Sequence, residues 1–230
     1  MALLYHSPLS APSRAIRLLV GEYGLDIGLQ EEQVQDQRAG FLDINPAGTV
    51  PVLVTNDRVI AAGGSVIAEF LDETVGIMKR ERRLHPEGAG QRAEMRRLTD
   101  WAFVKLEQEA LGTIVYERVT KRQIPASAGG GAPDSAALRR ARAILPFHLK
   151  YLGYLTATRN WIAGDEMTFA DLAVGASMSV LDYVGEVDWS EDESLKNWYA
   201  KLKSRPSFRP LLADRVRGMP PVSHYVDLDF

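Results

Sequence analysis

The sequence of 230 residues contains no cysteine. This absence excludes disulfide bonds, thiolate metal sites and a cysteine nucleophile. Only four histidines are present, His6, His85, His148 and His224, and they are too widely separated to show the spacing of metal ligands. We therefore expect packing or surface roles for the histidines, and no metal site.

The chain also lacks a net positive charge and long apolar runs. The chain has 27 basic and 30 acidic residues, and the net charge of −3 argues against general nucleic-acid binding. No apolar run approaches the roughly 20 residues that span a bilayer. The first residues, MALLYHSPLS, lack the basic segment of a signal peptide. We expect a cytoplasmic protein with no membrane span and no nucleic-acid partner.

The first 77 residues alternate short apolar runs with amphipathic segments. Strands are predicted at 2–6, 29–34, 52–54 and 59–61. Helices are predicted at 14–23, just before Asn45, and at 65–73. Ser13 is placed to cap the first helix, which Gly24 ends. The order β-α-β-α-β-β-α predicts an α/β domain over residues 1–77.

Longer helices follow the polar connection at 76–88. Apolar residues at steps of three and four predict a long helix over 88–118. Further helices are predicted at 137–152, 168–183 and 194–204. Pro146 should bend the first of these three, and the proline-rich tail should be mostly irregular. We expect residues 88–230 to form an all-helical domain with a C-terminal tail.

One motif in the first domain resembles the glutathione S-transferase superfamily. Residues 45–53, NPAGTVPVL, are similar to its NPxGxVPVL pattern. The resemblance implies that the bond between Val50 and Pro51 is cis, and that the backbone of Val50 pairs with the cysteinyl part of glutathione.

Two further motifs lie in the helical half. Residues 161–171 look like the family's folding motif, in which Thr168 and Asp171 form a structural capping box. The stretch from Trp198 to Pro206 resembles the end of the family's helical core. The three motifs imply the cytosolic glutathione S-transferase fold, with an α/β thioredoxin-like N-terminal domain and an all-α C-terminal domain.

The third helix departs from the family pattern ES-x-x-I-x-x-Y-L. The matching positions of Ile67, Phe70 and Leu71 fix the register. Gly63 and Gly64 then occupy the positions of the Glu and Ser that bind the γ-glutamyl group. Each lost charge-assisted bond is worth about 1.5–3 kcal/mol, and the side chain of Ser65 points about 100° further round the helix. We therefore interpret Val50, Pro51, Gly63, Gly64 and Ser65 as a degenerate glutathione site.

A Ser-type transferase also needs a hydroxyl just before the first helix. Ser10 fits this place, and Ser7 and Tyr5 are weaker candidates. Serines at strand–helix junctions are usually turn and cap residues. We expect no catalytic residue, and Ser10 is the candidate if the protein is active.

Two functions stay open. One is a Ser-type glutathione transferase or isomerase with an altered glutathione site. For the other, Gly63–Gly64 and the ending after Pro220 resemble the FzlA family of transferase-like bacterial cell-division proteins. That resemblance implies a non-catalytic homodimer without a cofactor. It implies binding to FtsZ filaments at the division site, promoting constriction and septal wall synthesis. We favour this second interpretation.

The tail supplies the expected partner site. Apolar side chains alternate there with Asp227 and Asp229, so we expect Tyr225 and these two carboxylates at a contact surface. Glu117 and Arg122, at the end of the long helix, are further candidates. A mixed-charge patch of this kind suits a polar and reversible contact.

Overall fold

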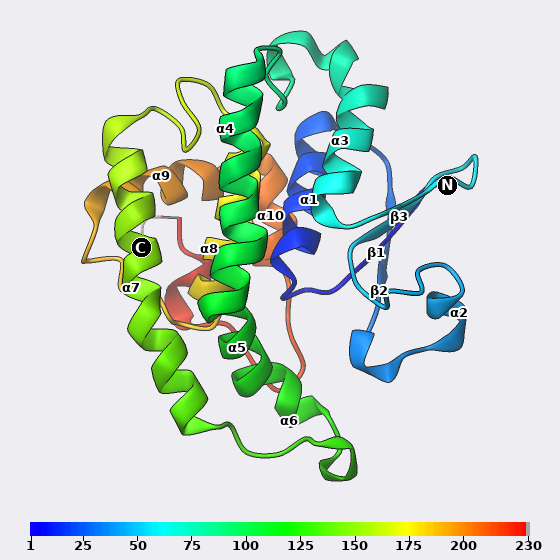
Figure 1. Ribbon diagram of the computed structural model, residues 1–230, viewed down its shortest axis with the longest axis vertical. Helices are drawn as coiled ribbons and strands as arrows, with labels where there is room; N and C mark the ends of the chain where they lie inside the picture. Colours follow the sequence, from blue (N-terminus) through cyan, green and yellow to red (C-terminus); the bar gives the residue numbers. More distant parts are fainter. Residues whose placement is uncertain (229–230) are drawn as a thin grey trace.

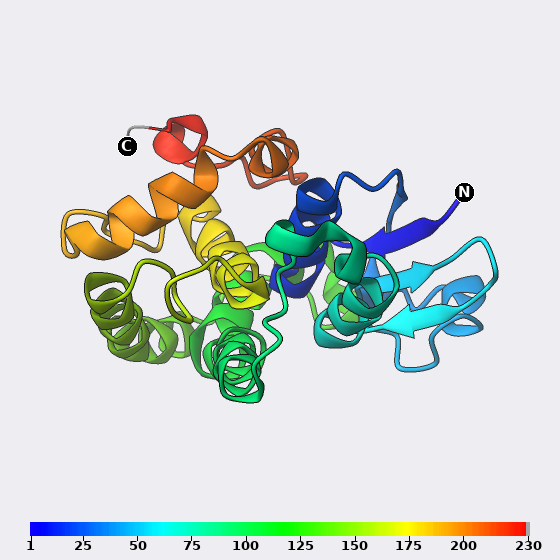
Figure 2. The same cartoon turned by 90° about the horizontal axis from the view of Figure 1, so that it is seen from above.

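The structure is a computed structural model that describes residues 1–228, except for the side chains of residues 81 and 82. A small α/β unit lies beside a larger helical unit (Figure 1). Seen from above, helix α1 of the first unit lies between the sheet and the helices of the larger unit (Figure 2). One apolar core runs through both units, because α1 packs against α8.

The α/β unit is built on a four-stranded sheet of order β2-β1-β3-β4. Strand β1 pairs in parallel with β2 and antiparallel with β3, which pairs antiparallel with β4. The elements in chain order are β1 (Leu3–His6), α1 (Ala11–Tyr23), β2 (Gly28–Glu31), η1 (Val34–Asp36), α2 (Ala39–Leu42), β3 (Val52–Val54), β4 (Ile60–Ala62) and α3 (Gly64–Thr74). The predicted order β-α-β-α-β-β-α is confirmed.

The first helix begins earlier than predicted. Ser10, not Ser13, is the N-cap, and its hydroxyl accepts from the N–H of Ser13 at 3.3 Å. Pro12 lies in the first turn, where its missing N–H costs nothing. Gly24 ends the helix in the left-handed conformation, as its position predicts. The prediction failed because three serines near the junction are equally good caps from their type alone.

The long helix of the second unit is continuous over residues 89–123, a little longer than the predicted 88–118. Its α-helical turns are interrupted twice by π-helical ones, which an apolar period of 3.6 does not reveal. The segments are α4 (Ala89–Asp100), η3 (Trp101–Leu111, π), α5 (Gly112–Val115), η4 (Tyr116–Thr120, π) and α6 (Lys121–Gln123). The 3-10 turn η2 (Gly76–Arg82) precedes this helix.

Every residue of α8 (Phe169–Tyr183) is buried. The other helices after the long helix are η5 (Ala126–Ala128), α7 (Ser135–Thr158), α9 (Glu193–Lys203), η6 (Pro206–Phe208), α10 (Arg209–Leu212) and η7 (Ser223–Val226). Pro146 lies inside α7. The tail is more ordered than predicted, since it contains α10 and η7. Within residues 1–228, no helix has the length and apolarity to cross a membrane.

Thr168 and Asp171 form a capping box at the start of α8. The Thr168 hydroxyl accepts from the N–H of Ala170 at 3.3 Å, and Oδ2 of Asp171 accepts from the N–H of Thr168 at 2.8 Å. The carboxylate has a second role that the motif did not reveal. Its Oδ1 accepts from the N–H of Ile162 at 2.8 Å and from Nε1 of Trp198 at 3.0 Å. Complete burial raises the pKa of Asp171 to about 6, although these donors lower it.

Asp171→Ala should destabilise the fold far more than loss of a cap alone. It leaves the N–H groups of Ile162, Thr168 and Trp198 buried without an acceptor, so we expect a loss of at least about 3 kcal/mol in the free energy of unfolding. Urea denaturation followed by circular dichroism measures this. The matched control is Asp165→Ala, an exposed carboxylate of the same segment, which should change stability by less than about 0.5 kcal/mol. A cost below about 1 kcal/mol for Asp171→Ala would contradict this prediction.

Candidate functional site

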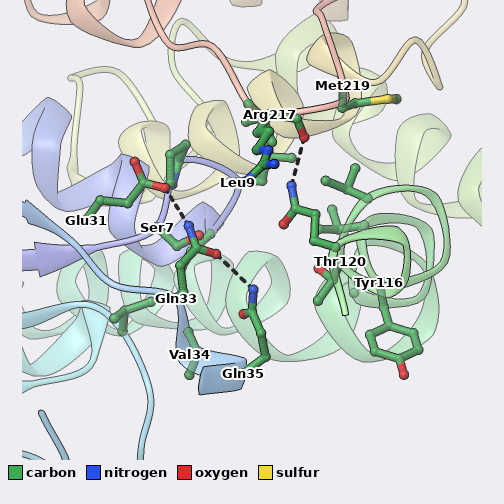
Figure 3. A pocket seen from close by; sticks show the side chains of 18 of the residues that line it. Ser7, Leu9, Glu31, Gln33, Val34, Gln35, Tyr116, Thr120, Arg217 and Met219 are labelled. Atoms are coloured by element: carbon green, nitrogen blue, oxygen red, sulfur yellow. Dashed lines mark hydrogen bonds between the residues drawn. The ribbon is translucent and has the colours of Figure 1, made fainter. Parts of the chain in front are cut away.

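A cleft of about 990 Å³ lies between the α/β unit and the second half of the long helix. One wall comes from the β1–α1 connection, from η1 and from the loop before β3. The other wall comes from the long helix, including Tyr116 and Thr120, and Arg217 and Met219 close one end (Figure 3). On the first wall, the side chains of Glu31, Gln33 and Gln35 are joined by hydrogen bonds of 2.8 and 2.9 Å.

The loop before β3 contains Val50 and Pro51, two of the residues interpreted from the sequence as a degenerate glutathione site. Buried Asn45 holds this loop, because its Nδ2 donates to the carbonyl of Thr49 at 2.9 Å. The peptide bond between Val50 and Pro51 is cis, and Val50 lines the cleft. The carbonyl of Pro51 accepts from the N–H of Gly63 at 2.9 Å, which ties the loop to the start of α3.

Gly63 and Gly64 have a structural reason to be glycine. Gly63 has φ +98°, a conformation that L side chains rarely adopt. A Cβ on Gly64 would lie 2.8 Å from Cε2 of Phe103 and 3.0 Å from Cβ of Pro12. The start of α3 therefore packs directly on α1 and the long helix. Neither glycine, nor the exposed Ser65, is among the described residues that line the cleft.

Ser7 and Ser10 both line the cleft, whereas Tyr5 does not appear among the described lining residues. The Ser10 hydroxyl accepts the N–H of Ser13, so one of its lone pairs serves the N-cap. The N–H of Ser7 donates to the hydroxyl of Ser13 at 3.3 Å. All three serines take part in shaping the β1–α1 connection, and Ser10 is the one that combines a cap with access to the cleft from the start of α1.

The structure changes the role expected of Tyr225. Its side chain has no solvent exposure. The hydroxyl accepts from Nη1 of Arg14 at 2.8 Å and donates to the carbonyl of Leu211 at 3.2 Å, and the ring meets that of Tyr183 edge-on at 5.1 Å. An apolar ring with a polar tip reaches inward here, because a buried arginine offers it a partner. Tyr225 therefore anchors the tail, and it is not an exposed contact residue of this chain.

Of the two carboxylates predicted in the tail, the structure describes only Asp227. Asp227 is exposed, and so are its neighbours Val226 and Leu228, each 44% accessible. Asp229 lies outside the described residues. A second, more open groove of about 640 Å³ is lined by His224 of the tail and by residues 185–190.

Glu117 and Arg122 do not form one patch. Glu117 is buried, and its carboxylate accepts from Nζ of Lys121 at 2.8 Å and from the N–H of Asp134 at 2.7 Å. These bonds fix the start of α7 against the long helix, so the side chain has a structural role. Arg122 is exposed and lines the cleft. The helical period places both residues on one helix, but only neighbouring elements decide which of them reaches solvent.

Sequence reasoning missed a pair of arginines on α1. Arg14 is fully buried, and Arg17 pairs with both carboxylate oxygens of Asp214 at 2.7 and 2.8 Å. Beside this pair, burial and then the charge of Arg17 lower the pKa of His6 to about 4. No local signal reveals these contacts, since their partners lie almost 200 residues away in the chain. Within the described residues, no group of His, Asp and Glu could hold a metal ion.

Comparison with known proteins assigns the family. Residues 4–80 match the family model described as glutathione S-transferase, N-terminal domain, and residues 134–215 match the C-terminal domain of the same family. The chain is 40% identical over 230 residues to FtsZ-localized protein A of Caulobacter vibrioides, covering 99% of this chain and 97% of that protein.

Solved structures agree with this assignment. A crystal structure described as a glutathione S-transferase from Sinorhizobium meliloti 1021 is 53% identical, with a TM-score of 0.98 and complete coverage of both chains. The structure of FzlA from C. crescentus is 40% identical, with a TM-score of 0.92, covering 100% of this chain and 99% of that one. With both domain models matched and relatives similar over the whole length, this chain belongs to the glutathione S-transferase family.

Proposed function

We propose that this protein binds FtsZ filaments at the division site of a bacterial cell, and that it promotes constriction and septal wall synthesis without catalysing glutathione transfer. The observation that carries the proposal is its 40% identity, over nearly the whole of both chains, to a relative named FtsZ-localized protein A. Similarity of this extent includes the tail as well as the two domains. The protein would act in the cytoplasm, where the filaments assemble.

The condition of the glutathione site supports a binding role. The backbone loop at Val50 and Pro51 is kept, but the two residues that would bind the charged γ-glutamyl group are glycines. In this fold Gly64 packs directly against Phe103 and Pro12, so the structure leaves no room for a ligand-binding side chain at that position. A fold that keeps its scaffold while losing ligand contacts is free to take a different role.

The exposed part of the tail supports a contact surface. Val226, Asp227 and Leu228 extend from Tyr225, which holds the chain at a fixed point of the core. Two apolar side chains beside a carboxylate on an anchored segment lose little conformational entropy when a partner binds. We propose that Asp227 and its neighbours make this contact, with Asp229, Arg122 and the groove beside His224 as further parts of it.

We also propose that the protein is a homodimer. Ile144, Phe147, Tyr151 and Tyr154 recur at steps of three and four along one side of α7. Phe147 and Tyr154 are 54% and 64% exposed, and Trp101 of the neighbouring long helix packs on Tyr151 at 4.2 Å. Exposed apolar side chains that gather on one face often mark a protein–protein interaction site.

The α/β unit offers a second apolar surface. Ile60 of β4 and Val66 of α3 are 50% and 55% exposed. A two-fold axis could bring α7 of each copy against β4 and α3 of the other copy. The aromatic surface and the apolar surface of both copies would then be covered. A dimer would also present two copies of the tail, which gives binding along a filament the advantage of two linked contacts.

A second candidate function is a Ser-type glutathione transferase with an altered site. It is favoured by the cis bond at Val50–Pro51, by Ser10 in the cleft, and by the 53% identical structure described as a glutathione S-transferase. Glutathione binding separates the two candidates, because the transferase requires it and the filament-binding role does not.

Co-sedimentation with polymerised FtsZ tests the main proposal. The wild-type protein should pellet with filaments and stay in the supernatant without them. Asp227→Lys should remain folded and lose most of this binding, because it reverses the charge of the exposed tail. The matched control, Glu166→Lys, reverses an exposed carboxylate before α8 and should bind normally.

If the wild-type protein does not pellet with FtsZ, the proposed function is wrong. If Asp227→Lys binds as the wild type does, the contact surface lies elsewhere on the molecule.

Sedimentation equilibrium tests the dimer. The chain of 25.5 kDa should behave as a species of twice this mass at micromolar concentration. Phe147→Glu should give a folded monomer, because a charge would be desolvated at the proposed interface. The control Arg139→Glu is exposed on the same helix but outside the aromatic stripe, and it should stay dimeric. A monomeric wild type would refute the dimer.

Calorimetric titration with glutathione should show no binding at millimolar concentration. Restoring the family residues should not help, since Gly64→Ser introduces a clash with Phe103 and Pro12, and Gly63→Glu strains the backbone. Each of these variants should cost about 1–3 kcal/mol in stability. Ser65→Ala at the adjacent exposed position should cost less than about 0.5 kcal/mol. Saturable binding of glutathione by the wild type would favour the transferase.

A further inference from the structure

The cleft contains a carboxylate that pairs with no other group of the described chain. Glu107 projects from η3 and lines the cleft wall. No hydrogen bond or ion pair to its side chain is found among the described residues. Burial raises the pKa of Glu107, and no charged neighbour contributes to this shift. The side chain is therefore a half-buried acid that no other described residue pairs with, at the edge of a cavity large enough for a ligand.

Glu107 differs in this from the other sheltered carboxylates of the protein. Asp72 pairs with Arg83 at 2.7 Å, Asp214 pairs with Arg17, and Glu186 pairs with Arg142 at 2.6 Å. Asp171 is satisfied by backbone and indole N–H groups. Sheltering a carboxylate costs free energy unless a cation or hydrogen-bond donors compensate. Among the described residues, no such protein partner is found for the half-buried carboxylate of Glu107.

The local backbone makes room for this carboxylate. The N–H of Gly112 bonds to the carbonyl of Glu107 five residues earlier, which is the π-helical pattern. A Cβ on Gly112 would lie 2.9 Å from Oε1 of Glu107. The glycine therefore leaves the space that the carboxylate occupies. Rare π-helical turns are often found at functional sites, and this one holds an uncompensated acid at the cleft.

We propose that the cleft binds a small molecule carrying a protonated amine, and that Glu107 is the counter-ion of that amine. An ammonium group supplies both the charge and the N–H donors that the carboxylate lacks. The cleft volume of about 990 Å³ matches the upper range of small-molecule sites. The proposal is independent of FtsZ binding and of glutathione.

The residues that line the rest of the cleft indicate the chemistry of the ligand beyond its amine. Val115 and Tyr116 line the cleft on the side of the long helix, where they provide apolar and aromatic surface. On the other wall, Ser7 and Gln33 offer hydrogen bonds (Figure 3), and the hydroxyl of Ser10 also lines the cleft. A molecule with an amine at one end and an aromatic or polar body fits this combination.

The test uses a panel of amines and the full-length protein. Tyramine, agmatine and spermidine are titrated calorimetrically, together with tyrosol, which replaces the amine of tyramine by a hydroxyl. At least one amine should bind, and tyrosol should bind more weakly than tyramine. Glu107→Gln should weaken binding of that amine by about tenfold to a hundredfold. Glu107→Asp, which keeps the charge, should retain part of the affinity.

The matched control is Glu191→Gln, which removes an exposed carboxylate outside the cleft and should bind as the wild type does. It detects general attraction of cations to an acidic protein. Glu107→Gln should stay folded, because the carboxylate makes no hydrogen bond or ion pair to another described residue, and urea denaturation checks this. If no amine of the panel binds, or if binding is equal in the wild type and Glu107→Gln, the proposal is wrong.

Discussion

Arg14 is the residue on which the two halves of the molecule depend. Its guanidinium has no solvent exposure, and it donates to the carbonyl of Pro8, to Ser179 of α8 and to the hydroxyl of Tyr225. A buried arginine is costly unless acceptors and a counter-charge surround it, and Oδ2 of Asp214 lies 3.7 Å from Nη2 of Arg14. The β1–α1 connection, the central helix and the tail must therefore all be in place together. Loss of any one of them would leave a desolvated cation.

This constraint places both functional surfaces. The β1–α1 connection that Arg14 holds carries Ser7 and Ser10 into the cleft. The tail that it holds ends in Val226, Asp227 and Leu228, which remain exposed. Arg14 thus holds both the tail of the proposed filament contact and the connection that brings serines to the proposed amine site. Each is a surface feature whose position is fixed by the core.

The start of α3 shows how packing restricts side chains beside the loop at Val50 and Pro51. The bond between these two residues is cis, and Gly64 packs directly on α1 and the long helix. Because Phe103 and Pro12 fill the space beside Gly64, the core opposes any larger side chain at this position. The carboxylate of Glu107 gives the same cleft a different chemical character.

The sequence by itself determined the family, the order of elements, the glycine replacement and the capping box. These depend on local patterns: apolar periodicity, turn residues and motifs of about ten residues. It did not determine which of three serines caps α1, that Tyr225 points inward, or that Asp171 also accepts from Ile162 and Trp198. Those outcomes were decided by tertiary structure, because burial and hydrogen-bond partners come from residues far away in the chain. For the same reason, only the folded cleft distinguishes Glu107 from an ordinary acid on a helix.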